Sequence, residues 1–265
     1  WLAGEQWKLD AFVAADNKTG PGIYELAYAK SFHVPVNEVT KDQRQIGKVE
    51  ELALGFGGGV GAFKTMARNY GVKMSDAEAD AVKEGWRAAH PNIVQYWWDL
   101  ERASKEAVMS PGTQTSAGPA DRCVKFRVKG SFLFCLLPSG RMLTYPYPQL
   151  KSRETPWGEL KDQIHYMNVD GTTGKWVETH TYGGKLSENI TQAVARDILA
   201  EAILRCEAEG FPVVLHVHDE VVVELPARDA LVWEGRCFAV VKENPSWAVG
   251  LPIAVEGWRG RRYHK

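Results

Sequence analysis

The sequence lacks most of the features that would place it in a membrane, secreted or zinc-stabilised class. It has four cysteines, and none of them forms a C-x-x-C pair or has a Cys/His spacing typical of zinc sites. No apolar run reaches the about 18 residues of a membrane span, and no basic segment precedes an apolar one at the N-terminus. We therefore expect free thiols, a reducing environment and a cytoplasmic protein.

The sequence also lacks an excess of charge of either sign. Lys plus Arg number 32 and Asp plus Glu number 33, which leaves a net charge of -1 over 265 residues. Any surface for a polyanion must therefore come from local clusters of basic residues. One such cluster comprises Arg122, Lys125, Arg127 and Lys129, which either contact phosphates or are simply solvated.

The pattern along the chain changes twice. Residues 1–118 are helical in pattern, with helices expected at 41–56, 60–70, 75–90 and onward to residue 109. Residues 119–183 contain short apolar runs bounded by glycine and proline, which is typical of β-strands. Residues 184–265 begin with a long amphipathic helix over 187–209 and continue with a strand, a tight turn and a strand over 213–225. We expect three regions with these boundaries.

The strand–turn–strand segment carries neighbouring carboxylates. Its apolar run is interrupted only by His216 and by the triplet His218-Asp219-Glu220. Adjacent carboxylates at a hairpin tip repel each other and gain from a bound divalent cation, which favours hard oxygen ligands. An ordinary solvated turn is the alternative, because Asp and Glu are common in turns.

A second pattern lies in the helix expected at residues 41–56. Arg44, Lys48, Leu52 and Phe56 recur every four residues, and each step turns by about 40°, so that all four share one broad face. Two cations followed by an apolar and an aromatic residue describe a surface for a triphosphate and a base. A solvated basic edge beside a core-facing Leu/Phe edge is the alternative.

Together the two patterns resemble family A (DNA polymerase I-like) DNA polymerases of the bacteriophage type. The family's fingers helix carries an Arg, a Lys, a discriminator residue and a Tyr-Gly pair at successive steps of four. The corresponding residues here are Arg44, Lys48, Leu52 and Phe56-Gly57. The family's second carboxylate motif, Val-His-Asp-Glu, corresponds to residues 217–220. The resemblance covers most of the chain and is thinnest across 112–182.

The resemblance implies an α+β fold and a specific reaction. The fold would be a fragment of the right-hand polymerase, with helical fingers at 1–118, a β-rich insertion or connection at 119–183, and a palm with antiparallel sheet and catalytic hairpin at 184–265. The reaction would be template-directed DNA synthesis, in which a primer 3′-hydroxyl attacks the α-phosphate of a dNTP. The implied partners are primer–template DNA, dNTPs and accessory replication proteins, without a membrane, in the cytoplasm of a bacterial host.

The resemblance also implies roles for single residues at the nucleotide. Arg44 and Lys48 would hold the triphosphate, with Lys48 placed to protonate the leaving pyrophosphate. Phe56 would stack at the nascent base pair, where it lacks the hydroxyl of the family's tyrosine. Leu52 stands at the discriminator position, where many members have Phe or Tyr. Tyr24 falls where bacterial members have a phosphate-contacting histidine.

At the DNA and the metal, the implied roles belong to the second half of the chain. Gln192 and Arg141 would contact the primer–template, and His218 the primer end. Two Mg²⁺ ions about 3.5–4 Å apart would stabilise the attacking and leaving oxygens. Asp219 would be a ligand of both ions, and Glu220 an outer ligand or an orienting group.

One motif of the family does not occur in the sequence. The first carboxylate motif, Asp-x-Ser-x-x-Glu-x-Arg, is expected upstream of Trp1, and the chain opens without an initiator methionine. This indicates a fragment boundary, with N-terminal processing as the alternative. A catalytically incomplete fragment that binds DNA or nucleotide without turnover is therefore a competing hypothesis.

Two further alternatives concern the reaction. A single-subunit RNA polymerase shares the Arg/Lys helix and a His-Asp turn, but Glu220 after Asp219 and an apolar Leu52 favour a DNA polymerase. An unrelated Mg²⁺-dependent hydrolase would use His218, Asp219 and Glu220. That hypothesis leaves the Arg44–Lys48–Phe56 pattern unexplained.

Overall fold

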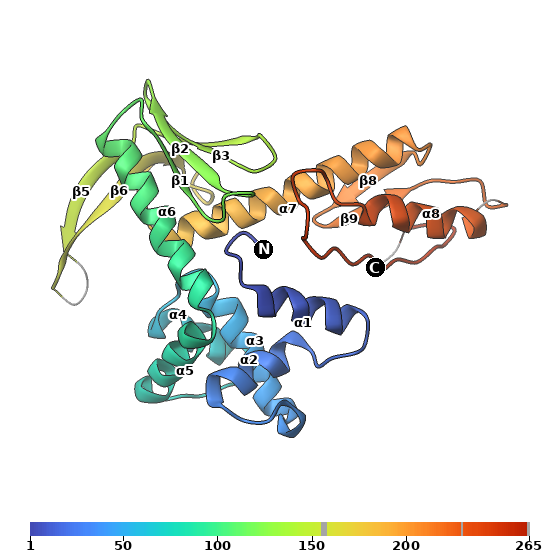
Figure 1. Cartoon of the computed structure of the whole chain (residues 1–265), viewed down its shortest axis with the longest axis horizontal. Helices are drawn as coiled ribbons and strands as arrows, with labels where there is room; N and C mark the ends of the chain where they lie inside the picture. Colours follow the sequence, from blue (N-terminus) through green and yellow to red (C-terminus); the bar gives the residue numbers. More distant parts are fainter. Residues whose placement is uncertain (155–157, 229, 264–265) are drawn as a thin grey trace. The chain divides into compact units, whose positions relative to one another are not determined.

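The computed structural model describes residues 1–154, 158–228 and 230–263 (Figure 1). The chain divides into two compact units, Trp1–Ile190 and Thr191–Lys265. Helices and antiparallel sheets both occur, which confirms the predicted α+β class. Among the described residues, no helix is both long and apolar enough to cross a membrane. The division of the chain into three domains, at 1–118, 119–183 and 184–265, stays a prediction.

The first half of unit Trp1–Ile190 is helical. Its elements are α1 (Gln6–Asp16), α2 (Ile23–Phe32), the short 3-10 helix η1 (Val36–Glu38), α3 (Lys41–Leu54), α4 (Val60–Asn69), α5 (Asp76–Ala89) and α6 (Pro91–Met109). The last four match the expected helices within two residues at each end. The helices α1 and α2 and the short η1 were not expected.

Local sequence signals set the ends of these helices. Thr40 and Gln43 form a capping box at the start of α3, and Ser75 and Glu78 form one at the start of α5. A core of buried side chains then holds α3, α4, α5 and α6 together. Its largest members are Leu54, Phe63, Trp86 and Trp97.

Two antiparallel sheets complete this unit. The first has the order β1 (Gln114–Ala117), β2 (Val124–Lys129), β3 (Phe132–Leu136), β4 (Met142–Pro146). The second has the order β5 (Gln149–Glu154), β6 (Leu160–Val169), β7 (Trp176–Thr181). Helix α6 packs against β1 and β2, so one face of the first sheet is covered (Figure 1). Strands β1 and β5 were not expected from the sequence.

The unit Thr191–Lys265 is built on the second part of α7 (Gly183–Ala208), a helix that the sequence predicted at 187–209. Gly210, at φ 81°, follows the helix, and Phe211 N–H donates to the Cys206 carbonyl over 2.8 Å. The hairpin of β8 (Val213–Val217) and β9 (Glu220–Val223) follows, and then α8 (Ala230–Lys242). Cys206, Phe211 and Val240 form the buried core of this unit.

Candidate functional site

Helix α3 carries Arg44, Lys48 and Leu52 on its outward side, and Phe56 lies in the turn that follows the helix. Arg44 and Leu52 are each 45% exposed, and Lys48 and Phe56 are half-buried. The core side of the helix carries Val49 and Leu54 instead. Leu52 therefore does not belong to a core-facing edge, which was the alternative interpretation of the spacing.

Arg44 is held by two residues of α2. Its Nε donates to Glu25 Oε1 over 2.8 Å, and its guanidinium lies 5.2 Å from the ring centre of Tyr24. Gly47 makes this arrangement possible, because a Cβ at that position would lie 2.0 Å from the Tyr24 carbonyl oxygen. The absence of a side chain at Gly47 thus lets α2 approach α3 closely enough to bring Tyr24 and Glu25 to Arg44.

Lys48 also lies over an aromatic ring. Its Nζ is 5.1 Å from the ring centre of Tyr70, the residue that ends α4 and is 38% exposed. A cation over a ring face gains from the ring's negative quadrupole. Neither Tyr70 nor Glu25 was predicted from the sequence. Tyr70 lies 22 residues after Lys48, and Glu25 lies 19 residues before Arg44. Neither contact can be predicted from a local sequence pattern.

Phe56 stands where α3 meets the start of α7, and glycines permit this contact. A Cβ on Gly184 would lie 2.2 Å from the Phe56 carbonyl oxygen and 2.9 Å from the Tyr182 ring. Gly57 has φ 78°, a conformation that a residue with a side chain adopts only at a cost. The Phe56 backbone is thereby fixed against α7.

A buried polar cluster lies behind α3. Glu51 accepts from Trp86 Nε1 over 3.2 Å, its Oε1 lies 3.5 Å from His90 Nε2, and it forms an ion pair with Lys8. Burial alone would raise the pKa of Glu51, but the hydrogen bond with His90 and the charge of Lys8 bring that pKa below its usual value. This cluster joins α1, α3 and α5 and supports the helix that carries Arg44 and Lys48.

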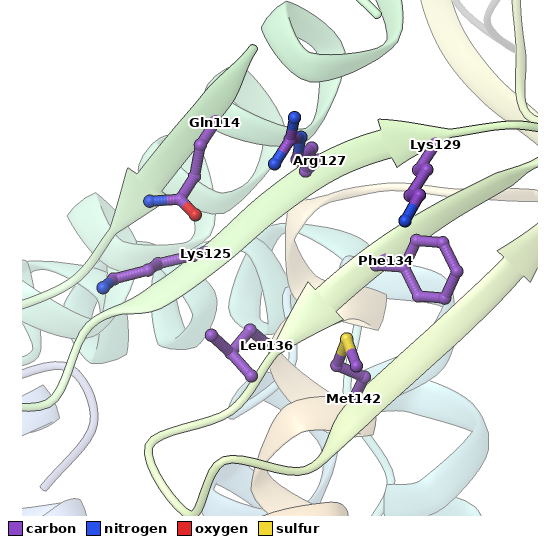
Figure 2. Close-up of a pocket in the computed structure, with 7 residues that line it drawn as sticks. All are labelled: Gln114, Lys125, Arg127, Lys129, Phe134, Leu136 and Met142. Atoms are coloured by element: carbon purple, nitrogen blue, oxygen red, sulfur yellow. The ribbon is translucent and has the colours of Figure 1, made fainter. Parts of the chain in front are cut away.

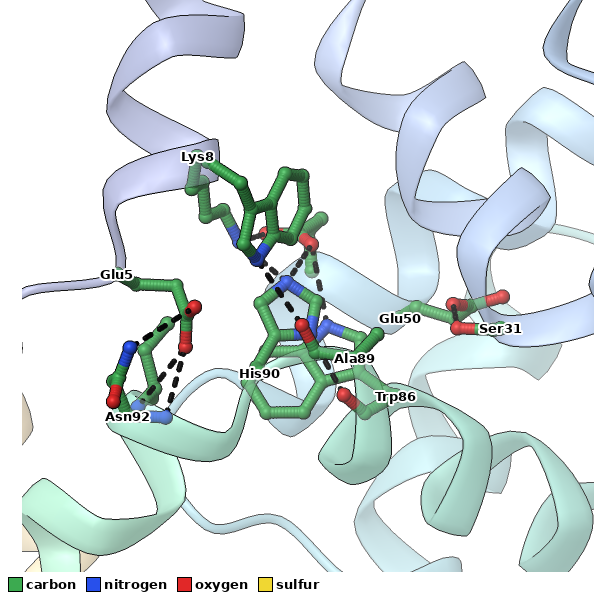
Figure 3. Close-up of polar contacts among 11 residues, drawn as sticks. Glu5, Lys8, Ser31, Glu50, Trp86, Ala89, His90 and Asn92 are labelled. Atoms are coloured by element: carbon green, nitrogen blue, oxygen red, sulfur yellow. Dashed lines mark hydrogen bonds and ion pairs between the residues drawn. The ribbon is translucent and has the colours of Figure 1, made fainter.

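The neighbouring Glu50 is fully buried. Its Oε2 accepts from Ser31 Oγ over 2.6 Å, and its Oε1 has no partner among the described residues (Figure 3). Burial raises the pKa of Glu50 to about 8. The side chain is therefore mostly a neutral acid at pH 7, which lowers the cost of its place in the core.

The hairpin of β8 and β9 presents its carboxylates at a two-residue loop. Val217 pairs with Glu220, so His218 and Asp219 make the turn. His218 has φ 51°, a left-handed conformation, and both loop residues are exposed. Glu220 is half-buried and accepts from Tyr263 Oη over 2.9 Å. Tyr263 was not singled out from the sequence.

This loop brings two carboxylates together at one end of the hairpin. Asp219 and Glu220 offer adjacent hard oxygen donors, as predicted, and such donors suit Mg²⁺. Within the described ranges, no group of three or more His, Cys, Asp and Glu residues is arranged to hold a metal ion. Two carboxylates fit the chemistry of such a cation but do not complete its ligand set.

The remaining predicted residues lie in both units. Gln192 is exposed on α7 in the same unit as the hairpin. Arg141 is exposed in the turn between β3 and β4, in the same unit as α3. Gly140, at φ 87°, precedes it, and Leu137 N–H donates to the Arg141 carbonyl over 2.8 Å. The backbone of this turn is therefore well defined, which presents the Arg141 side chain at the surface.

Comparison with known proteins identifies the class of molecule. No protein-family model matches the chain. In sequence it is 40% identical, over 271 aligned residues, to a DNA polymerase of Bacillus phage SP02. That alignment covers 100% of this chain and 39% of the phage protein, so the chain spans about two-fifths of its relative's length.

A solved structure shows the same fold. The POL domain of Pol1 from M. smegmatis, in complex with DNA primer-template and dNTP, matches with a TM-score of 0.52 and 16% sequence identity. The match covers 92% of this chain and 34% of that one. The sequence match and this shared fold confirm the resemblance read from the motifs. The chain is therefore similar over its whole length to part of a bacteriophage DNA polymerase, in agreement with the resemblance to family A (DNA polymerase I-like) DNA polymerases.

Proposed function

We propose that the chain takes part in template-directed DNA synthesis, as a nucleotidyltransferase that joins a dNTP to a primer 3′-hydroxyl. The observation that carries this proposal is the order of Arg44, Lys48 and Leu52 along the outward side of α3, with Phe56 in the turn that follows the helix. The sequence relative is a DNA polymerase, which supports DNA rather than RNA as the product.

Arg44 and Lys48 would bind the triphosphate. Fixed cations next to phosphate oxygens stabilise the negative charge that develops as the phosphoryl group is transferred. In the structure Arg44 is paired with Glu25, so triphosphate binding would exchange one anionic partner for another. Lys48 would donate a proton to the leaving pyrophosphate.

Leu52 and Phe56 would form the apolar end of the nucleotide site. The exposed Leu52 cannot form a hydrogen bond with the sugar of the nucleotide, so it would discriminate between sugars only by steric contact. Phe56 would stack on the nascent base pair, and its carbonyl contact with Gly184 fixes the backbone that carries the ring. Tyr24, over Arg44, would line the phosphate end.

Asp219 and Glu220 would be ligands of divalent cations, with Mg²⁺ as the expected ion. Such cations, when bound, stabilise the attacking and the leaving oxygens of the displacement. The family's first carboxylate motif does not occur in the 265 residues, and another segment of the polymerase would supply the remaining carboxylate. Tyr263 would hold Glu220 in place through its 2.9 Å hydrogen bond.

Contacts with the primer–template would come from three exposed residues: Gln192, Arg141 and His218. Accessory replication proteins are a further proposed class of partner. Because the sequence relative belongs to a Bacillus phage, the cytoplasm of a bacterial host is the proposed site of action.

Primer extension tests this proposal. On a primed template with Mg²⁺ and one dNTP at a time, only the complementary nucleotide should be added. Lys48→Ala should lower the rate of addition by about 100-fold or more, as expected for the loss of a preorganised charge. The exposed Lys41→Ala, at the first residue of the same helix, is the matched control. In a form of the polymerase that extends primers, equal rates for Lys48→Ala and Lys41→Ala would refute the role of Lys48.

A second candidate is a segment that binds DNA or nucleotide without turnover by itself. The incomplete set of carboxylates among the described residues favours it. The extension assay is therefore run with the 265-residue chain and with the same chain joined to a segment that carries the first carboxylate motif. Extension by the joined form alone, with DNA binding by both, would support this candidate for the isolated chain.

A further inference from the structure

The first sheet has an outer face that the proposed reaction does not use. Side chains alternate along a strand, and in β2 this places Val124, Phe126 and Val128 in the core. The side chains between them point to the opposite face, where residues of β3 and β4 join them around an open hollow (Figure 2). We call this surface the outer sheet face; it comprises Lys125, Arg127, Lys129, Phe134, Leu136 and Met142.

Cations and apolar groups lie side by side on the outer sheet face. The β2–β3 register sets Lys125 opposite Leu136 and Arg127 opposite Phe134. Lys129 lies opposite Phe132, which is 40% exposed, and Met142 is 55% exposed. Exposed apolar side chains gathered on one face of a sheet, beside charged ones, are typical of a binding surface.

The charge of this face has one sign. The three cations lie on one strand, and the sheet register pairs them only with uncharged residues of β1 and β3. Alternate residues of a strand recur about every 6.7 Å, so the cations form a row. A row of like charges on an apolar surface attracts a polyanion that also has apolar faces.

We propose that the outer sheet face binds a segment of single-stranded DNA, with phosphates along the β2 cations and bases against the β3 side chains. Proteins that bind single strands combine a basic track with aromatic side chains on which bases stack. A duplex fits less well, because its bases are already stacked on one another and do not offer their faces to the side chains of the sheet. The choice of DNA rests on the proposed function.

The test measures binding of a fluorescently labelled oligothymidylate of about 12 nucleotides to the 265-residue chain by anisotropy. The triple variant Lys125→Gln, Arg127→Gln, Lys129→Gln should bind at least about tenfold more weakly at low salt. The slope of log affinity against log salt should fall in magnitude by about 2, since each phosphate contact with a single strand contributes about 0.7.

A matched variant controls for net charge. Lys73, Lys175 and Lys242 are exposed and lie outside the outer sheet face, and changing all three to Gln removes the same charge. This control should bind like the wild type. Equal losses in both triple variants would show a nonspecific charge effect and would overturn the proposal.

The ring of Phe134 provides an independent test. Phe134→Leu keeps an apolar side chain but removes the stacking surface, so binding of oligothymidylate should weaken about fivefold or more. Binding of an abasic chain of the same length should not change. Thermal unfolding of each variant verifies that the sheet is intact.

If the triple variant of the β2 cations and Phe134→Leu both bind oligothymidylate as tightly as the wild type, the proposal is refuted. An acidic protein would then be the partner to test on this face. The assay contains no primer, nucleotide or metal ion. A failure of nucleotidyl transfer therefore does not alter its result, and a failure of this assay leaves the proposed function standing.

Discussion

At the scale of single residues, the turn of the β8–β9 hairpin holds a strained histidine. His218 has φ 51°, where glycine is favoured, and such strain is concentrated at functional sites. We predict that His218→Gly leaves the free energy of unfolding unchanged or raises it by up to about 1 kcal/mol. The same change should weaken primer–template binding. Urea denaturation and the KM for primer–template check the two effects; a clear loss of stability would contradict the assignment of strain.

The pair of Glu25 and Arg44 yields a prediction about nucleotide affinity. Glu25 competes with a triphosphate for the guanidinium, so Glu25→Gln should lower the KM for dNTP several-fold without changing kcat. Stability should change by less than about 1 kcal/mol, because the ion pair is partly exposed. Glu38→Gln, on the exposed η1, is the matched control. A higher KM would show that Glu25 orients Arg44 instead of competing for it.

Glu50 makes stability depend on pH. Its pKa is about 8 in the folded protein against 4.5 in the unfolded chain, so the folded state binds the extra proton between these values. The free energy of unfolding should therefore fall as pH rises from 4.5 to 8, by up to about 1.4 kcal/mol per unit from this group.

Glu50→Gln removes that dependence while it keeps the shape of the side chain. In urea unfolding, the difference between pH 5 and pH 8 should be markedly smaller for the variant than for the wild type. Parallel pH profiles for the two proteins would show that Glu50 is charged in the folded state.

At the scale of elements, the contact between α3 and α7 depends on glycine. A helical Gly→Ala change normally stabilises by up to about 1 kcal/mol. At Gly184 the new methyl group would meet the Phe56 carbonyl at 2.2 Å, so we predict a loss of about 1–3 kcal/mol from overpacking. Gly171→Ala, in an open turn with no atom within 4 Å, is the control. Thermal unfolding compares the stability of the two variants. Equal stability would mean that the backbone at Phe56 and Gly184 can move apart at little cost.

The elements that the sequence predicted have strong local signals, and those that it missed do not. Helix α5 begins with a capping box, and α3 is followed by three glycines, so both were expected. Helix α2 buries Ala27, Tyr28, Ala29 and Ser31, which do not follow one stripe along the helix. Its position depends on contacts with α3 and α5, which no local pattern records.

At the scale of the whole molecule, the parts of the site with a local sequence pattern were predictable, and those that depend on contacts between distant residues were not. The spacing of Arg44, Lys48 and Leu52 predicted their shared side of α3, whereas Phe56 lies in the turn after the helix, which ends two residues earlier than expected. The triplet after Val217 predicted the hairpin loop. The partners of these residues were not predictable, because Tyr24 and Glu25 reach Arg44 only through the close approach that Gly47 allows. The roles of all the site residues, from Tyr24 and Arg44 to Asp219 and Glu220, stay predictions.

The central claim is that this chain supplies a catalytic carboxylate to a DNA polymerase, and primer extension with Asp219→Asn tests it most directly. Asp170→Asn is the control, since Asp170 also lies in a β-turn but accepts hydrogen bonds from Thr172 and Thr173. With Mg²⁺ and all four dNTPs, in the form of the polymerase that extends primers, Asp219→Asn should reduce extension by more than about 100-fold. Asp170→Asn should extend like the wild type. Undiminished extension by Asp219→Asn would contradict the account.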